Sequence, residues 1–342
     1  MLVLRLAGMS LRIAPRPVVV GLALVAVILA AAVASLTIGD YPLSAVDVVR
    51  TLLGAGTPAS EFAVTTLRLP RVLTALAVGA AFGIAGSVFQ SLSRNPLGSP
   101  DIIGFTTGSA TGALVGVILL GGGTAVVAGG AVVGGLVVAV LVYLLAFQRG
   151  SARPHQLVLV GIGMSAVLAA ANGYLLTRAR LGDAMTAAVW LTGSLNGRGW
   201  EHAVPVGSAL AALLPLTVLL ARSLDALALG DDIAGGLGVR VERARLALLF
   251  VAVALTAVGT ASAGPVPFVA LAAPQIARRL TRSPGTNLLP AALTGAALLA
   301  LADLGAQRLL APLQLPVGVL TGALGGVYLV WLLAGRTRSA RV

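Results

Sequence analysis

Arginines and a few carboxylates at the borders of apolar runs are the residues of this chain that could do chemistry. Arg68 and Arg71 precede one such run, and Arg308 follows another. A guanidinium group in this place can bind a carboxylate of a partner or ligand, or it can anchor a helix at the membrane interface. Asp303 comes little more than one helical turn before Arg308, and we expect these two side chains to pair.

The most charged segment, residues 222–245, contains a candidate binding element. Asp231 and Asp232 stand at the start of a predicted short helix, where acidic residues interact favourably with the helix dipole. Three glycines, at positions 235, 236 and 238, predict its end. Such a helix either docks against a soluble partner or is a solvated connector, and the residues alone leave both interpretations open.

Three amide side chains, those of Gln90, Asn172 and Gln275, fall inside apolar runs. Polar groups inside a membrane need partners, so these amides either bond between helices or line a water-filled path. Asn95, just beyond the run that holds Gln90, is a further candidate for the path.

Two sets of regularly spaced glycines predict close helix packing, because a face without side chains lets another helix approach. The first set is Gly104, Gly108, Gly112 and Gly116, and the second is Gly318, Gly322 and Gly326. We expect the helix with the first set to start at Ser99 and Pro100. Residues 67–116 would then form a pair of packed membrane helices.

No catalytic constellation or metal site is predicted. His155 and His202 are expected to be solvated loop residues, and neither has a second histidine or a carboxylate pair at ligand spacing. The chain has no cysteine, which excludes disulfides and thiolate chemistry. It also has no lysine, so it cannot build a Walker A phosphate loop. If the protein does ATP-driven work, another chain must supply the ATPase.

Composition indicates a polytopic membrane protein. The 342 residues are 58% hydrophobic and 10% charged, with a mean hydropathy of +1.01, whereas soluble domains carry about 25% charged residues. The net charge of +12 comes from arginines in short clusters between apolar runs. This pattern is typical of charge that sets membrane topology, and it argues against nucleic-acid binding.

Ten apolar runs predict ten transmembrane helices in a single all-α domain, residues 1–342. They are residues 17–38, 69–92, 101–120, 124–147, 156–176, 203–221, 246–263, 265–280, 288–307 and 316–334. The first run is long enough to favour a retained helix over a cleaved signal peptide. Ser44–Leu53 is expected to form a short amphipathic helix, residues 121–135 to contain a turn, and residues 177–202 to form a polar connection.

The arginines predict which ends face the cytoplasm. With an inside N-terminus, sixteen of the 23 basic residues fall in inner segments and seven in outer ones, in agreement with the positive-inside rule. Both termini are then cytoplasmic, residues 222–245 lie inside, and Arg68, Arg71 and Arg308 lie outside.

Five motifs resemble those of the FecCD-type permeases, the membrane subunits of ABC importers for iron-siderophores and vitamin B12. They are Arg68-Leu-Pro-Arg71, Arg94-Asn-Pro-Leu-Gly-Ser-Pro100, Leu227–Gly238, Ala263–Pro274 and Gln314–Thr321. The resemblance implies a BtuC-like fold of ten transmembrane helices in the inner membrane. It also implies two permease subunits around a central path, two ATPase subunits below them and an extracytoplasmic binding protein. No cofactor is bound by the permease itself, since ATP and Mg belong to the ATPase.

The same resemblance assigns roles to residues. The expected coupling segment, which fits into a cleft of the ATPase, consists of Leu229, Gly230, Asp231, Asp232, Ile233, Ala234, Gly235, Gly236, Leu237 and Gly238. Arg68, Arg71 and Arg308 match arginines that receive acidic residues of the binding protein. The chain looks most similar to the ferric-enterobactin-type branch, in which two different permeases pair. Gln275 departs from the histidine of many relatives, which weakens any carry-over from the vitamin B12 members at that position.

The cargo and the transporter class are not decided by the residues alone. The expected cargo is a ferric siderophore of catecholate type, but vitamin B12 or haem would require the same permease architecture. A stand-alone secondary transporter is disfavoured, because such proteins place ionisable groups near the membrane midplane, where this sequence predicts amides and hydroxyls.

Overall fold

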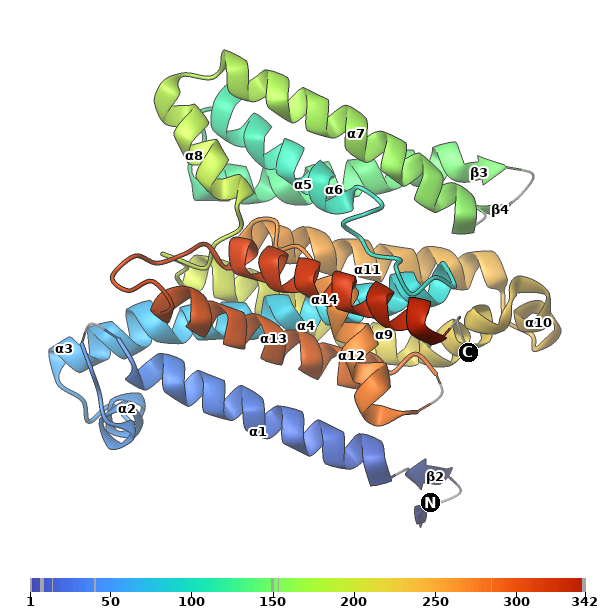
Figure 1. Cartoon of the computed structure of the whole chain (residues 1–342), viewed down its shortest axis with the longest axis horizontal. Helices are drawn as coiled ribbons and strands as arrows, with labels where there is room; N and C mark the ends of the chain where they lie inside the picture. Colours follow the sequence, from blue (N-terminus) through green and yellow to red (C-terminus); the bar gives the residue numbers. More distant parts are fainter. Residues whose placement is uncertain are drawn as a thin grey trace.

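Figure 1 shows the computed structural model of the chain, an assembly of long helices with two short β-hairpins. The structure describes residues 2–6, 9–13, 15–39, 41–148, 151–152, 154–283 and 285–339. Arg149, Arg153 and Arg341, which entered the arginine count, lie outside these residues.

The elements follow one another in this order. The first half of the chain forms β1 (Leu2–Leu6), β2 (Met9–Ile13), α1 (Pro15–Thr37), α2 (Ala45–Leu52), α3 (Pro58–Glu61), η1 (Phe62–Arg68), α4 (Leu69–Leu92), α5 (Phe105–Leu114), η2 (Val115–Leu119), α6 (Thr124–Ala146), β3 (Phe147–Gln148), β4 (Ser151–Ala152) and α7 (Pro154–Arg178). The second half forms α8 (Leu181–Leu191), α9 (Trp200–Leu229), α10 (Asp231–Gly236), α11 (Val241–Ala263), α12 (Val269–Thr281), α13 (Leu288–Arg308) and α14 (Val317–Ser339). Strands β1 and β2 pair antiparallel, as do β3 and β4.

Seven helices in the described part of the chain are long and apolar enough to cross a membrane: α1, the continuous α3–η1–α4 helix, α6, α7, α9, α11 and α13. Three more of the expected runs coincide with the shorter α5–η2 helix, α12 and α14. The short amphipathic helix is confirmed as α2, and the expected turn precedes Thr124. The polar connection at 177–202 differs from expectation, because it contains the apolar helix α8.

Helices α4 and α11 form the centre of the molecule, and α13 and α9 pack against them. Most side chains of α4 and α11 are buried, whereas few of those on α1, α7 and α9 are. The polar turns around α2 and α3 lie at one end of the helices. Both chain termini lie toward the opposite end, where α10 is found (Figure 1).

Small residues let the helices pack at backbone contact, as predicted, but with different partners. A β-carbon added at Gly112 would lie 1.9 Å from the carbonyl oxygen of Gly130, and one at Gly108 would lie 2.6 Å from Val138. The glycine face of α5 therefore packs against α6, and the expected pairing of residues 67–92 with residues 101–116 is wrong. Gly79 and Gly83 of α4 instead contact α13, with Gly79 against Gly295.

Two helix starts also differ from the sequence expectation. Helix α5 begins at Phe105 rather than near Ser99, because residues 99–104 form turns that end in Gly104 with a left-handed φ of 90°. Helix α12 begins only at Val269, after Phe268, which also has a left-handed backbone with φ of 68°. The run predicted over 265–280 is thus a short helix of 13 residues with an irregular entry.

The second glycine set is only partly used in packing. Gly318 lies against the carbonyl oxygen of Thr192, and Gly322 is near Pro267, but no atom lies within 4 Å of the β-carbon position of Gly326. Its neighbour Gly325 takes the packing position instead, since an added β-carbon would be 2.1 Å from the ring of Phe268.

Candidate functional site

A cavity of about 430 Å³ lies at the end of the molecule opposite α10, where the predicted docking arginines meet. We call it the arginine cavity. Its lining includes Arg68 and Arg71 at the start of α4, Arg308 at the end of α13, and Arg198 in the turn before α9. Among the lining residues that the structure describes, none is acidic. The cavity is therefore strongly cationic and suited to an anionic side chain or ligand.

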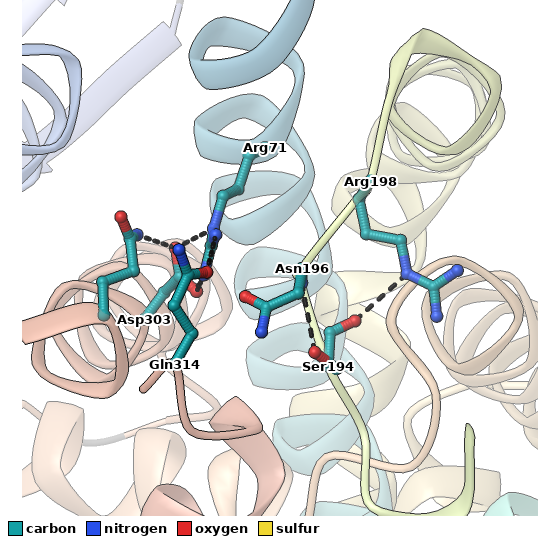
Figure 2. A network of polar contacts seen from close by, with 7 residues as sticks. Arg71, Ser194, Asn196, Arg198, Asp303 and Gln314 are labelled. Carbon is teal, nitrogen blue, oxygen red and sulfur yellow. Dashed lines mark hydrogen bonds and ion pairs between the residues drawn. The ribbon is translucent and has the colours of Figure 1, made fainter. Parts of the chain in front are cut away.

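Arg71 is held by a buried carboxylate from another helix. Its Nη2 donates to Asp303 Oδ1 at 2.8 Å and its Nε donates to Asp303 Oδ2 at 3.0 Å. Gln314 accepts a further bond from Arg71 (Figure 2). Gln307 donates to Asp303. The expected pairing of Asp303 with Arg308 is wrong, because the α4–α13 contact brings Arg71 closer to this carboxylate than Arg308 is.

The other predicted arginines are placed differently from Arg71. Arg68 donates to two backbone carbonyls, those of Leu36 at 2.6 Å and Tyr41 at 2.5 Å, so it also joins α4 to the end of α1. Gly39 makes this approach possible, since an added β-carbon would be 2.3 Å from Arg68 Nη2. Arg308 lines the cavity with a buried Nε that has no hydrogen-bond partner in the described structure.

Arg198 is a residue of this site that sequence reasoning missed. Its Nε donates to the backbone oxygen of Ser194 at 3.1 Å (Figure 2). Its Nη1 lies 2.9 Å from His202 Nε2. Burial lowers the pKa of the Arg198 guanidinium, and the Glu201 carboxylate opposes that shift. The prediction of a solvated His202 is wrong, because this side chain is buried in the first turn of α9. His155 lies in the first turn of α7 and is exposed.

The acidic helix predicted at 231–238 is present as α10. Gly230 leaves α9 with φ of 126°, a conformation that favours glycine, and Asp231 and Asp232 occupy the first turn. Ala234 is fully buried, whereas Leu229, Ile233 and Leu237 are 63%, 53% and 66% exposed. Because these three side chains are close in sequence around one short helix, the segment presents an apolar surface bordered by carboxylates.

The amides expected in the membrane mostly bond between segments. Gln90 donates to the backbone oxygen of Leu271 at 2.9 Å and accepts from Gln275 at 2.8 Å, and Gln275 also donates to the backbone oxygen of Pro96. Arg278 contacts Gln90 as well. Asn172 is buried, and its Oδ1 has no partner in the described structure.

A second cavity, of about 690 Å³, opens beside α10. Gln90 and Asn95 line it, together with Leu229, Leu237 and Arg94. Asn95 accepts a bond from the backbone N–H of Leu97 and so shapes the turn after α4. The cavity brings two of the predicted path residues next to two residues of the acidic helix segment.

No cluster of three or more metal-ligating side chains occurs among the residues that the structure describes. A bundle of apolar helices of membrane-spanning length, with a cationic cavity at one end and an acidic, partly apolar projection at the other, is the arrangement expected of a membrane permease.

Comparison with known proteins identifies the family. The model of the FecCD transport family matches residues 25–335, and the chain belongs to that family. It is 46% identical over 317 residues to the ferric enterobactin transport system permease protein of Escherichia coli (strain K12), covering 93% of this chain and 96% of the relative. It is 41% identical to the achromobactin transport system permease protein of Dickeya dadantii (strain 3937), covering 90% and 88%.

A solved structure confirms the fold. An inward-facing structure described as a metal-chelate type ABC transporter matches with a TM-score of 0.83 and 28% identity, covering 93% of this chain and 99% of the other. The chain is thus a multi-pass permease of an inner-membrane ABC importer, which works with an ATPase and a binding protein and is not itself the ATPase.

Proposed function

We propose that this permease imports a ferric siderophore, of catecholate type, by alternating access. The observation that carries the proposal is the similarity, over nearly the whole of both chains, to a permease whose name specifies ferric enterobactin. Relatives named for achromobactin and for ferric citrate are 41% and 37% identical, which supports iron chelates as the broader cargo class.

The arginine cavity is the proposed docking site for acidic residues of the extracytoplasmic binding protein. Arg308 lines the cavity and is one proposed donor, and Arg198 adds a cation that the motifs did not indicate. Arg71 contributes from a fixed position, because Asp303 already orients its guanidinium.

Residues 222–245, with Leu229–Gly238 at their tip, form the proposed cytoplasmic coupling segment. Exposed Leu229, Ile233 and Leu237 suit a cleft on the ATPase, and burial of such side chains contributes about 1.5–3 kcal/mol each. In this proposal ATP-driven closure of the two ATPase subunits moves α10, and two non-identical FecCD-type permeases rock against each other. The termini and α10 are then cytoplasmic.

Transport in proteoliposomes tests the cargo. The complete importer should accumulate a ferric catecholate in the presence of ATP and binding protein, and vitamin B12 and haem should not compete. Uptake of vitamin B12 at a comparable rate, or uptake by the permease alone without ATP, would contradict the proposal.

Surface substitutions test the coupling segment. We expect Leu237→Asp to abolish co-purification of the ATPase. Leu313 is similarly exposed but lies at the opposite end of the molecule, so Leu313→Asp should leave co-purification intact. The absence of native cysteine allows a clean test of sidedness. A single cysteine in place of Asp232 should react with a membrane-impermeant reagent only from the cytoplasmic side.

A further inference from the structure

Arg245 is a charged side chain in the interior of the protein. It lies in the second turn of α11 and is only 2% exposed, which makes it the largest fully buried side chain of the described structure. A buried guanidinium is unfavourable unless carboxylates pair with it. An arginine that only sets the membrane topology can stay exposed, so the positive-inside rule does not explain why Arg245 is buried.

The Arg245 guanidinium joins two carboxylates from different helices. Its Nη2 donates to Asp231 Oδ2 of α10 at 2.7 Å, and its Nη1 donates to Glu242 Oε2 of α11 at 2.9 Å. Tyr143 of α6 donates its hydroxyl to the other oxygen of Glu242 at 2.5 Å. One chain of polar contacts thus connects α10, α11 and α6.

The covalent connection between α10 and α11 is poorly suited to transmit movement. Gly235 and Gly236 end α10 and Gly238 lies in the connection itself, and glycine is the residue with the widest backbone freedom. The planar guanidinium, by contrast, holds its partners in a fixed fork geometry. The ion pair with Asp231 bridges this flexible turn and attaches the first turn of α10 directly to α11.

Helix α11 carries such a movement into the centre of the molecule. Leu248, Val251 and Leu255 on this helix are almost fully buried, and α11 packs against α4, α6 and α9. At its far part, an added β-carbon on Gly259 would lie 2.9 Å from the ring of Phe82 in α4. Close packing of this kind passes a displacement on instead of absorbing it.

We propose that Arg245 is a positioning residue that transmits movement of α10 to α11, and that Asp231 is its contact on the ATPase-facing segment. This inference rests on the proposed coupling role of α10. Asp231 then acts toward the interior of the permease, while Asp232 and the exposed apolar side chains face the ATPase.

The test measures siderophore transported per ATP hydrolysed by the complete importer in proteoliposomes. Arg245→Lys keeps the positive charge but loses the planar guanidinium that binds both carboxylates. We expect normal assembly and normal ATP hydrolysis, and a reduction of transport per ATP by about fivefold or more. Asp231→Asn should have a similar effect. The double variant should be no worse than the stronger single one, because both remove the same contact. Tyr143→Phe should have a smaller effect.

Normal transport per ATP in an assembled Arg245→Lys importer would overturn the inference. If that variant does not accumulate, Asp231→Asn decides, because Asp231 is partly exposed and its loss leaves the Arg245–Glu242 pair in place. Failure of the underlying proposal gives a different result, since Leu237→Asp would then still bind the ATPase.

Discussion

The two ends of the permease both carry an arginine–carboxylate contact, but they expose opposite partners. In the arginine cavity the carboxylate of Asp303 is 3% exposed and Arg71 is 13% exposed. Beside α10 the guanidinium of Arg245 is 2% exposed, whereas Asp231 and Glu242 are 38% and 30% exposed. One end therefore presents cations to a partner, and the other presents acids.

This difference shows how one type of ion pair serves two surfaces. A buried partner fixes the position of the exposed one, and the sign of the exposed charge selects what can dock. Between the two ends lie helices packed at backbone contact, so the ends are connected by a structure with little room for local adjustment.

The largest effect is expected where that connection is broken. A β-carbon at position 112 would lie 1.9 Å from the carbonyl oxygen of Gly130, so the side chain of Gly112→Leu would clash with the α6 backbone. We therefore expect this variant not to accumulate in the membrane. Gly129→Leu is the matched control on α6, because no atom lies within 4 Å of its β-carbon position. Quantitative immunoblotting checks both, and normal levels of the Gly112 variant would mean that α5 and α6 can separate.

Removal of the buried carboxylate comes next. Asp303→Ala leaves Arg71 without its counter-charge, and we expect the free energy of unfolding to fall by about 3 kcal/mol. Asp231→Ala leaves the buried Arg245 paired with Glu242, so it should cost less, about 1 kcal/mol. Thermal unfolding of the two variants in detergent measures the difference, and equal losses would remove the contrast between the two ends.

Charge reversal tests what each end offers to a partner. Arg308→Glu should weaken binding-protein association by about tenfold at low salt, and the difference should shrink as salt screens the charges. Asp232→Lys, at the opposite end, should leave this affinity unchanged. Surface-bound importer titrated with binding protein gives both values, and an unaffected Arg308→Glu variant would exclude this arginine from docking.

The smallest effect is expected for the capping box that Ser44 and Asp47 form at the start of α2, because it takes no part in either arginine–carboxylate contact. Hydrogen bonds from Ser44 lower the pKa of Asp47 below its ordinary 3.8. A lowered folded-state pKa contributes stability above the ordinary value, and that contribution is lost as pH falls through the folded-state pKa. Asp47→Asn should thus slightly lower the unfolding midpoint at pH 6, and this deficit should shrink as the pH falls below 3.8. A deficit that does not shrink with falling pH would assign the effect to lost hydrogen bonds rather than to charge.

The sequence does not predict which residues remote in the chain contact each other. The spacing of Gly104 to Gly116 predicts a close-packing face but does not say which helix it meets, and the structure selects α6. Proximity in sequence predicts Arg308 as the partner of Asp303, but the partner is Arg71, more than two hundred residues away. Arg198 lies outside the five motifs, and its place in the cavity lining indicates a role.

What the amino-acid sequence determined by itself is local or additive. Apolar runs, glycine spacing and arginine bias sum along the chain, so they predicted the membrane class, most spans and the acidic helix at Asp231. The tertiary structure alone decided which charges meet, because an ion pair depends on a few ångströms between segments remote in sequence. Arg245 illustrates this, since it reads as one more cytoplasmic arginine until the fold buries it between Asp231 and Glu242.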